Sequence, residues 1–409
     1  MPLDSHVLQP NASGSTHEEK NPMNEQQSGA ARSIDLKGTH YVALDGLRGL
    51  AILLVVVYHF GLMHQDAHGS SPGALLGFAQ LGWMGVDLFF VLSGFLITGI
   101  LLETKDRPHY FRNFLMRRFL RIWPIYYLNL LVFFVVAPLL LNALPDELQS
   151  MRDKQAWFWL YGANWLFARE GSFETTGGGY FWSLAVEEQF YLVWPLVVFW
   201  CSRRSLALTC VALFVGSAVL RMTLVLNGGN TNAAYTMTFT HLEPLVMGAF
   251  LALAVRREAS TQALERVLAA GAVAGLAGLA YVRLADGDFF FWSRHMASYG
   301  YTLAAIVFGC LLVRVFRSKA TGFGGLAFRN RFMVATGKYS YALYLAHVPI
   351  AHAIYAIVVR DSVIARFGYG TTYVLFFAVA FAVSWFAAWL SWHVFEKHVL
   401  RLKQYFAYQ

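Results

Sequence analysis

Apolar runs of about twenty residues recur along most of this 409-residue chain and restrict the folds it can adopt. A helix that spans a membrane needs about 20 consecutive apolar residues, whereas a soluble helix keeps a polar face. Charged residues make up only 14% of the chain, against roughly 25% in soluble domains. The sequence therefore predicts an all-α, polytopic transmembrane helical bundle. The ten predicted spans are 43–62, 81–102, 122–142, 182–201, 205–226, 240–255, 264–284, 298–315, 338–359 and 371–394.

Lysine and arginine are distributed unevenly between alternate loops. With the N-terminus inside, only eight of the 32 bases fall outside or near outer helix ends. Cytoplasmic loops are enriched in Lys and Arg, so this bias predicts an N-in, C-in protein. It also explains the net charge of +8 without a nucleic-acid partner. The eight outer bases are Arg152, Lys154, Arg169, Arg221, Arg283, Arg294, Arg360 and Arg366.

The segments outside the predicted spans differ in character. Residues 1–38 are polar and nearly free of aromatic residues, which predicts a disordered cytoplasmic tail. The membrane domain is predicted over 39–400, and 401–409 form a short cytoplasmic tail. The basic and aromatic stretch 105–121 is typical of an amphipathic helix on the membrane surface. The loop 143–181 is long enough to indicate a functional role.

Arg48 and His59 lie in the first predicted span, eleven residues apart. At about 100° per residue, this spacing is about 20° past three turns, so both side chains share one helix face. Along the axis they stand roughly 16 Å apart. Ionisable groups inside a membrane are costly and therefore indicate function or pairing. The alternative is a snorkelling arginine and a packed histidine.

Asp87 and Ser93 lie in the second predicted span. Asp87 is a predicted catalytic partner of His59, because a carboxylate would fix the tautomer of the imidazole and stabilise its protonated form. Ser93 is predicted to bind substrate, and the alternative is a hydroxyl that caps a backbone carbonyl.

Arg118 and Arg121 are three residues apart, so they share a helix face. Two guanidinium groups on one face suit phosphate oxygens, which predicts a cofactor-binding role. Ordinary anchoring at the cytoplasmic membrane surface is the alternative.

Glu187 and Glu188 open the fourth predicted span, and Tyr191 follows them. Adjacent helical residues point about 100° apart, so only one carboxylate can face a given cavity. We predict that Glu187 is catalytic and that Tyr191 binds substrate. Interface residues are the alternative reading of the pair. His347, in the middle of the ninth span, is a further predicted substrate-binding residue.

No metal site is predicted. His64 and His68 have the i,i+4 spacing of metal ligands, but no third ligand is evident. Three cysteines, Cys201, Cys210 and Cys310, show no CxxC spacing, and we interpret them as packing residues.

Together these motifs resemble the acyltransferase-3 family, bacterial membrane O-acyltransferases that modify cell-surface sugars. The resemblance covers about residues 39–400. It is a resemblance to the stand-alone form of the family, without the outer hydrolase-like domain that some members carry. One departure is His241–Pro244, where the family pattern is of an Arg-x-Asp-Gly type; it would reflect a changed acceptor. The motifs that carry the resemblance are Arg48-x10-His59, Gly85–Phe95, Arg118-x-x-Arg121, Trp182–Tyr191 and Gly337–His347.

The resemblance implies acyl-CoA, usually acetyl-CoA, as a donor on the cytoplasmic side of the bacterial inner membrane. It implies an acceptor hydroxyl on a polysaccharide, peptidoglycan, a lipid-linked sugar or a small glycoside. By motif, His59 matches the family's essential histidine and Glu187 its recurrent glutamate. Arg48, Arg118 and Arg121 match its essential arginines.

The resulting hypothesis is an O-acetyltransferase. The arginines hold the coenzyme phosphates, His59 acts as a general base on the acceptor hydroxyl, and Asp87 or Glu187 orients the imidazole. Transfer is direct or passes through an acyl-histidine. The alternative function is a membrane carrier for a glycan or small anion, which would also place charged groups inside a bundle. A carrier, however, needs no fixed phosphate clamp on one side.

Overall fold

The computed structural model describes residues 41–68, 79–141, 143–173, 178–256, 261–318 and 322–408, and these residues form helices and connecting turns without a β-strand. The all-α prediction is thus confirmed for the described part of the chain. The prediction for the tail 1–38 lies outside the described residues, as do the side chains of His64 and His68.

All ten predicted spans are helical in the structure. Eight segments of the described chain are long and apolar enough to cross a membrane. The other two predicted spans are α9, which carries two glutamates, and α12, which has only 12 residues. The span count of ten and the orientation therefore stay predictions. The ten helices are α1 (Val42–His68), α3 (Gly85–Thr104), α4 (Tyr110–Leu131), α9 (Phe181–Trp200), α10 (Arg203–Leu226), α12 (Glu243–Ala254), α13 (Thr261–Asp286), α14 (Tyr301–Arg317), α17 (Ser340–Val358) and α19 (Tyr369–Ser391).

Shorter elements extend or connect these helices. The extensions are η2 (Gln80–Met84) before α3, η3 (Val132–Val136) and α5 (Ala137–Leu140) after α4, η5 (Met296–Gly300) before α14, and η6 (Trp392–Glu396), α20 (Lys397–Arg401) and η7 (Leu402–Phe406) after α19. The connecting helices are α6 (Asp146–Asp153), α7 (Gln155–Trp159), α8 (Ala163–Glu170), α11 (Thr231–Thr236), η4 (Thr238–Thr240), α15 (Phe323–Arg329), α16 (Arg331–Lys338) and α18 (Asp361–Phe367).

The basic stretch expected as a separate surface helix is instead the beginning of the third span. One helical run continues from Tyr110 to Leu140, with Pro124 in its interior. Proline removes a single backbone donor, and helices in a membrane bundle accommodate that loss through local adjustment. The arginines of this stretch are therefore fixed in position by a helix that also packs in the bundle.

The described residues of the loop 143–181 are largely helical. The loop carries α6, α7 and α8, whose side chains Met151, Phe158 and Phe167 are buried. The hydroxyl of Tyr126 on α4 donates a hydrogen bond to the carbonyl of Phe158 at 2.8 Å, which ties the loop to the third span. The loop therefore forms a wall of the bundle.

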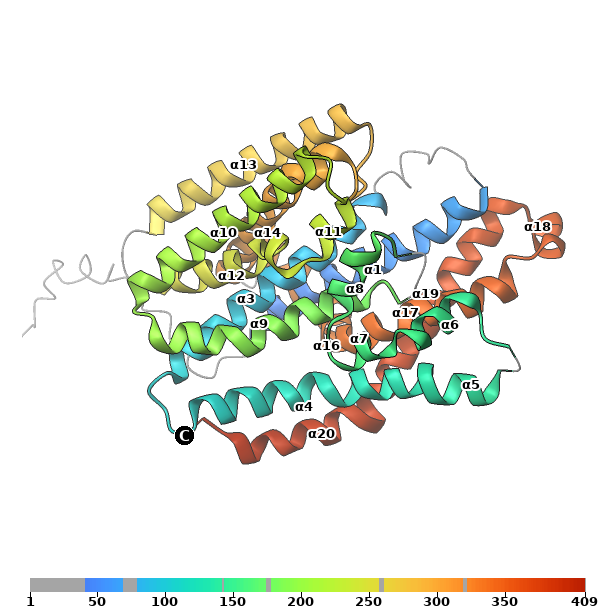
Figure 1. Ribbon diagram of the computed structural model, residues 1–409, viewed down its shortest axis with the longest axis horizontal. Coiled ribbons are helices and arrows are strands. Elements are labelled where there is room, and N and C mark those ends of the chain that lie inside the picture. Colours follow the sequence, from blue (N-terminus) through green and yellow to red (C-terminus); the bar gives the residue numbers. More distant parts are fainter. Residues whose placement is uncertain are drawn as a thin grey trace, which may run out of the picture. The chain divides into compact units, whose positions relative to one another are not determined.

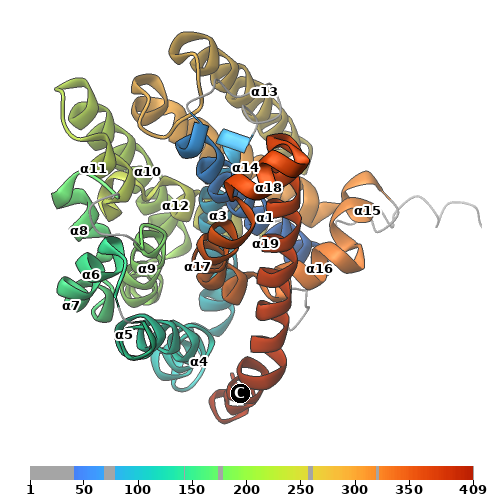
Figure 2. The same ribbon diagram turned by 90° about the vertical axis from the view of Figure 1, so that its right-hand side faces the viewer.

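The packing of α1 and α3 positions the candidate site. Helix α3 packs on α12 and α14, and α1 packs on α16 and α17 (Figures 1 and 2). The approach of α3 and α12 depends on glycine: a Cβ at Gly94 would clash with the carbonyl of Leu245, and one at Gly248 would clash with that of Val91. Small residues at helix contacts allow such close backbone approach in membranes.

Candidate active site between two cavities

Two cavities lie in the bundle, and α1 contributes to both. The first, the histidine cavity, has a volume of about 440 Å³ and is lined by His59 together with Tyr58, Trp83, Tyr180, Trp182, Tyr235 and Trp292. The second, the arginine cavity, has a volume of about 100 Å³ and is lined by Arg48, Arg118, Arg121, Ser93, Glu187 and Tyr191. Val86 and Tyr344 line both cavities, so the two spaces meet at these side chains.

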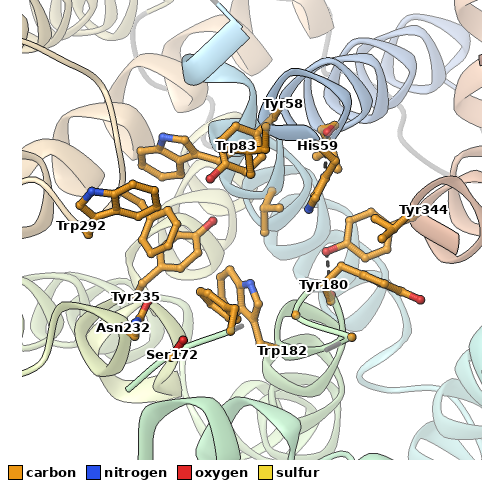
Figure 3. Close-up of a pocket in the computed structure, with 18 of the residues that line it drawn as sticks. Tyr58, His59, Trp83, Ser172, Tyr180, Trp182, Asn232, Tyr235, Trp292 and Tyr344 are labelled. Atoms are coloured by element: carbon orange, nitrogen blue, oxygen red, sulfur yellow. Dashed lines mark hydrogen bonds between the residues drawn. The ribbon is translucent and has the colours of Figure 1, made fainter. Parts of the chain in front are cut away.

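His59 reaches into the histidine cavity from α1 (Figure 3). Its Nδ1 lies 2.9 Å from the carbonyl oxygen of Val55, one turn earlier in the helix. A carbonyl can only accept a hydrogen bond, so Nδ1 carries the proton of the neutral ring. The other nitrogen, Nε2, therefore keeps its lone pair, which is the arrangement that a general base requires.

His347 on α17 supports the same tautomer of His59. Its Nδ1 lies 2.7 Å from the carbonyl oxygen of Tyr344 and 3.1 Å from that of Leu343, so Nδ1 carries the proton. Nε2 of His347 is then an acceptor, and it lies 3.2 Å from Nδ1 of His59. His347 is fully buried. The sequence predicted that His347 binds substrate, whereas the structure places it against the candidate base.

Asp87 does not contact His59. Its Oδ1 lies 2.6 Å from Nε2 of His241, and both side chains are buried. The ring of His241 is enclosed by Trp182, Tyr235 and Tyr301, at centroid distances of 5.4, 5.1 and 5.0 Å. The expected Asp87–His59 pair is thus replaced by an Asp87–His241 pair between α3 and the start of α12. No sequence pattern predicts this pairing, apart from the departure noted at His241–Pro244.

The three predicted phosphate-binding arginines line one cavity, although Arg48 comes from α1 and the other two from α4. The charges of Arg48 and Arg118 act on Arg121, so the three guanidinium groups repel one another. Arg48 forms an ion pair with Asp45 at 3.3 Å. A cluster of like charges in a partly enclosed space favours an anion, because the anion removes the repulsion.

The predicted polar residues Ser93, Glu187 and Tyr191 form one chain of hydrogen bonds in the arginine cavity. The hydroxyl of Tyr191 donates to Oε1 of Glu187 at 2.5 Å, and it also contacts Oγ of Ser93. Glu187 therefore lies with the arginines, and it makes no contact with the imidazole in the described structure. Glu188 points elsewhere and accepts a hydrogen bond from Trp123 at 3.0 Å, as the 100° offset of adjacent residues requires.

Comparison with known proteins identifies the family of this chain. The Acyl_transf_3 family model, described as an acyltransferase domain, matches residues 41–389. The chain belongs to the Acyl_transf_3 family. This result confirms the resemblance identified from the sequence motifs.

Two relatives of this Acyl_transf_3 member carry names that specify a reaction. Over 223 residues the chain is 34% identical to the peptidoglycan O-acetyltransferase OatA of Listeria monocytogenes. The match covers 51% of this chain and 33% of the relative. Over 323 residues the chain is 27% identical to the O-acetyltransferase OatA of Staphylococcus aureus. This match covers 75% of this chain and 50% of the relative. The chain thus spans between a third and a half of the length of these relatives. No solved structure matches the chain.

A buried ionic network near the candidate site was not predicted. Arg221 on α10 forms an ion pair with Glu243 on α12, and both side chains are fully buried. Thr302 accepts a hydrogen bond from Arg221 at 2.7 Å and donates one to Glu243 at 2.7 Å. Arg221 had been assigned to an outer helix end. The sequence feature that could have predicted this pair is the presence of opposite charges in two apolar helices. Charged groups in a membrane are tolerated best when they pair with one another.

Proposed function

We propose that this protein is a membrane O-acetyltransferase, which transfers an acetyl group from acetyl-CoA to a hydroxyl of a cell-envelope glycan. The observation that carries the proposal is the junction of the two cavities at Val86 and Tyr344. One cavity gathers cations suited to phosphate, and the other presents an imidazole nitrogen with a free lone pair. A donor and an acceptor that enter from opposite sides would therefore meet near His59.

The donor is proposed to bind through its phosphates in the arginine cavity. Coenzyme A carries a pyrophosphate and a 3′-phosphate, and arginine forks hold phosphate oxygens with two parallel hydrogen bonds. The pantetheine arm would extend past Val86 and place the thioester beside His59. Because Lys and Arg are enriched on the same side as this cavity, we infer that this side faces the cytoplasm of a bacterial inner membrane, where acetyl-CoA is made.

The acceptor is proposed to be a sugar that enters the histidine cavity. Aromatic rings with a few polar groups form most of its lining, which is typical of small-molecule sites. The apolar C–H faces of a pyranose ring stack on indole and phenol rings, and its hydroxyls pair with groups such as Asn232 and Ser172. The name of the Listeria relative specifies peptidoglycan, so we propose a peptidoglycan sugar as the first acceptor to test.

The reaction follows from the tautomer of His59. Nε2 takes the proton of the acceptor hydroxyl while the oxygen attacks the thioester carbonyl carbon. The new C–O bond forms and the C–S bond breaks, so an acetyl ester and a thiolate result. The imidazolium then returns its proton to the thiolate, which leaves coenzyme A and a neutral His59. His347 would hold the imidazole in its reactive orientation throughout.

Reconstitution tests this proposal. The purified protein in lipid vesicles is supplied with acetyl-CoA labelled in the acetyl group and with soluble peptidoglycan fragments, and products are measured by mass spectrometry. The wild type is expected to add one acetyl unit, and His59→Ala to add none above background. Solute uptake by the wild type without any acetylated product would instead favour a carrier.

Direct transfer and a covalent route can be distinguished in the same vesicles. Labelled acetyl-CoA is mixed with the wild-type protein without acceptor and quenched rapidly. We expect no label on the protein, since the proposed acceptor attacks the thioester itself. Label retained by the wild type and absent from His59→Ala would contradict direct transfer and support an acetyl-histidine intermediate.

A further inference from the structure

The chain folds back along α4 after the last long helix. We call residues 397–408 the C-terminal strap; it includes α20 and η7 and lies beside the first half of α4 (Figures 1 and 2). Asn113 donates a hydrogen bond to the carbonyl of Ala407 at 2.9 Å. Arg117 donates to the carbonyls of Lys403 and Phe406 at 3.2 and 3.4 Å. Side chains of α4 therefore hold the backbone of the strap.

Aromatic contacts fix the strap at a second set of points. The guanidinium of Arg112 lies 5.3 Å from the ring centre of Phe406, and that of Arg117 lies 5.1 Å from the ring centre of Tyr408. Cation–π contacts at such distances are favourable, and more so where water is excluded. The path of the strap along α4 is thus determined by side chains and not by chain connectivity alone.

This path brings Lys403 beside the arginines of α4. Arg117, which contacts the carbonyl of Lys403, shares a helix face with Arg121, and the guanidinium of Arg121 lies 5.6 Å from the ring centre of Trp392 in η6, just before the strap. Lys403 is partly buried, and the charges of Arg118, Arg121 and Arg48 act on it. Three carboxylates, Asp45, Glu396 and Glu187, act on members of the same cluster. Lys403 and the three arginines of the arginine cavity are four cations against three carboxylates, and this excess of positive charge favours a bound anion.

We propose that Lys403 is a phosphate-binding residue that acts with Arg118 and Arg121 on one phosphate group of the acyl-CoA donor. The proposal rests on the proposed function, because it assumes that acyl-CoA is the donor. A lysine ammonium is a point charge with three donors and a flexible stem, so it can follow a phosphate that rigid guanidinium forks have already positioned. The strap therefore contributes to donor binding, beyond its packing on α4.

Coenzyme A binding and donor kinetics test this role. Binding of coenzyme A to the full chain in detergent is measured by calorimetry for the wild type, Lys403→Ala and Lys403→Arg. The matched control is Arg401→Ala, which removes an exposed cation from the same strap. Lys403→Ala is expected to weaken binding about tenfold, as for one charge-assisted hydrogen bond. Lys403→Arg should restore most of the affinity, and Arg401→Ala should match the wild type.

A donor without phosphates separates phosphate binding from packing. The KM for acetyl-CoA should rise about tenfold in Lys403→Ala while kcat changes little, and the KM for acetyl-pantetheine should be the same as in the wild type. Equal effects on both donors, or no effect on either, would overturn the proposal. If the wild type itself binds no coenzyme A, the donor assignment under the proposed function fails together with it. If the wild type binds coenzyme A and Lys403→Ala binds it equally well, the proposed role of Lys403 fails while the donor assignment stands.

Discussion

Nδ1 of His59 lies 3.2 Å from Nε2 of His347, across the packing of α1 against α17. The backbone carbonyls beside each ring require a proton on both Nδ1 atoms, so the Nδ1–H of His59 is shared between the carbonyl of Val55 and Nε2 of His347. This relationship leaves Nε2 of His59 free in the histidine cavity. A neutral histidine therefore contacts His59 where the sequence predicts a carboxylate, Asp87.

Replacing His347 tests whether it orients the candidate base. His347→Leu removes the acceptor, and we expect kcat to fall about tenfold, the value of one hydrogen bond of about 1.4 kcal/mol. His347→Gln keeps an acceptor oxygen near the same place and should retain most of the activity. The KM for acetyl-CoA should stay unchanged in both variants, because the arginine cavity is untouched. Equal losses in the two variants would indicate packing rather than orientation.

Val86 tests the junction between the cavities. Val86→Phe adds a ring where the two spaces meet, so the thioester should no longer reach His59. We expect kcat to fall about a hundredfold, comparable to other misplacements of reacting groups, while binding of coenzyme A is retained. Val193→Phe is the matched control, because Val193 on α9 is 58% exposed. Full activity of Val86→Phe would mean that transfer does not pass this point.

Salt concentration tests the electrostatic character of donor binding. The range of charge interactions falls from about 10 Å at 0.1 M salt to about 3 Å at 1 M. We expect the KM for acetyl-CoA to rise across this range, and the KM for an uncharged sugar acceptor to stay constant. Arg118→Ala should reduce the salt dependence, whereas Arg360→Ala, an exposed arginine outside the cluster, should not. A KM for acetyl-CoA that is independent of salt would contradict phosphate binding by the arginines.

The Arg221–Glu243 pair is expected to stabilise the bundle. Glu243→Ala leaves a buried guanidinium without its partner, which costs about 3–5 kcal/mol. The double variant Arg221→Met/Glu243→Leu removes both charges and should recover most of that loss. Glu265→Ala serves as the control, since its ion pair with Arg317 is exposed and long, at 3.8 Å. Unfolding in detergent measures the series; an unchanged midpoint for Glu243→Ala would show that the pair contributes nothing.

Local pattern was sufficient to predict the helices and the polar face of α1. The spacing of Arg48 and His59 depends only on helix geometry, and in the structure His59 lines the histidine cavity and Arg48 the arginine cavity. The different directions of Glu187 and Glu188 follow from the same geometry. Helix bounds were less certain where a span is short or polar: α12 has 12 residues, and the basic stretch before the third span proved to be its first turns.

The helical segments could be predicted from the sequence alone, because apolar length and a 3.6-residue period are local properties. The burial of Arg221 could not be predicted in this way. The partners of the buried polar groups depend on tertiary packing. Asp87 meets His241 across 154 residues, and His59 meets His347 across 288. Such contacts depend on which helices pack together and at what rotation. Local periodicity does not encode that information, and close approaches at residues such as Gly94 set it instead.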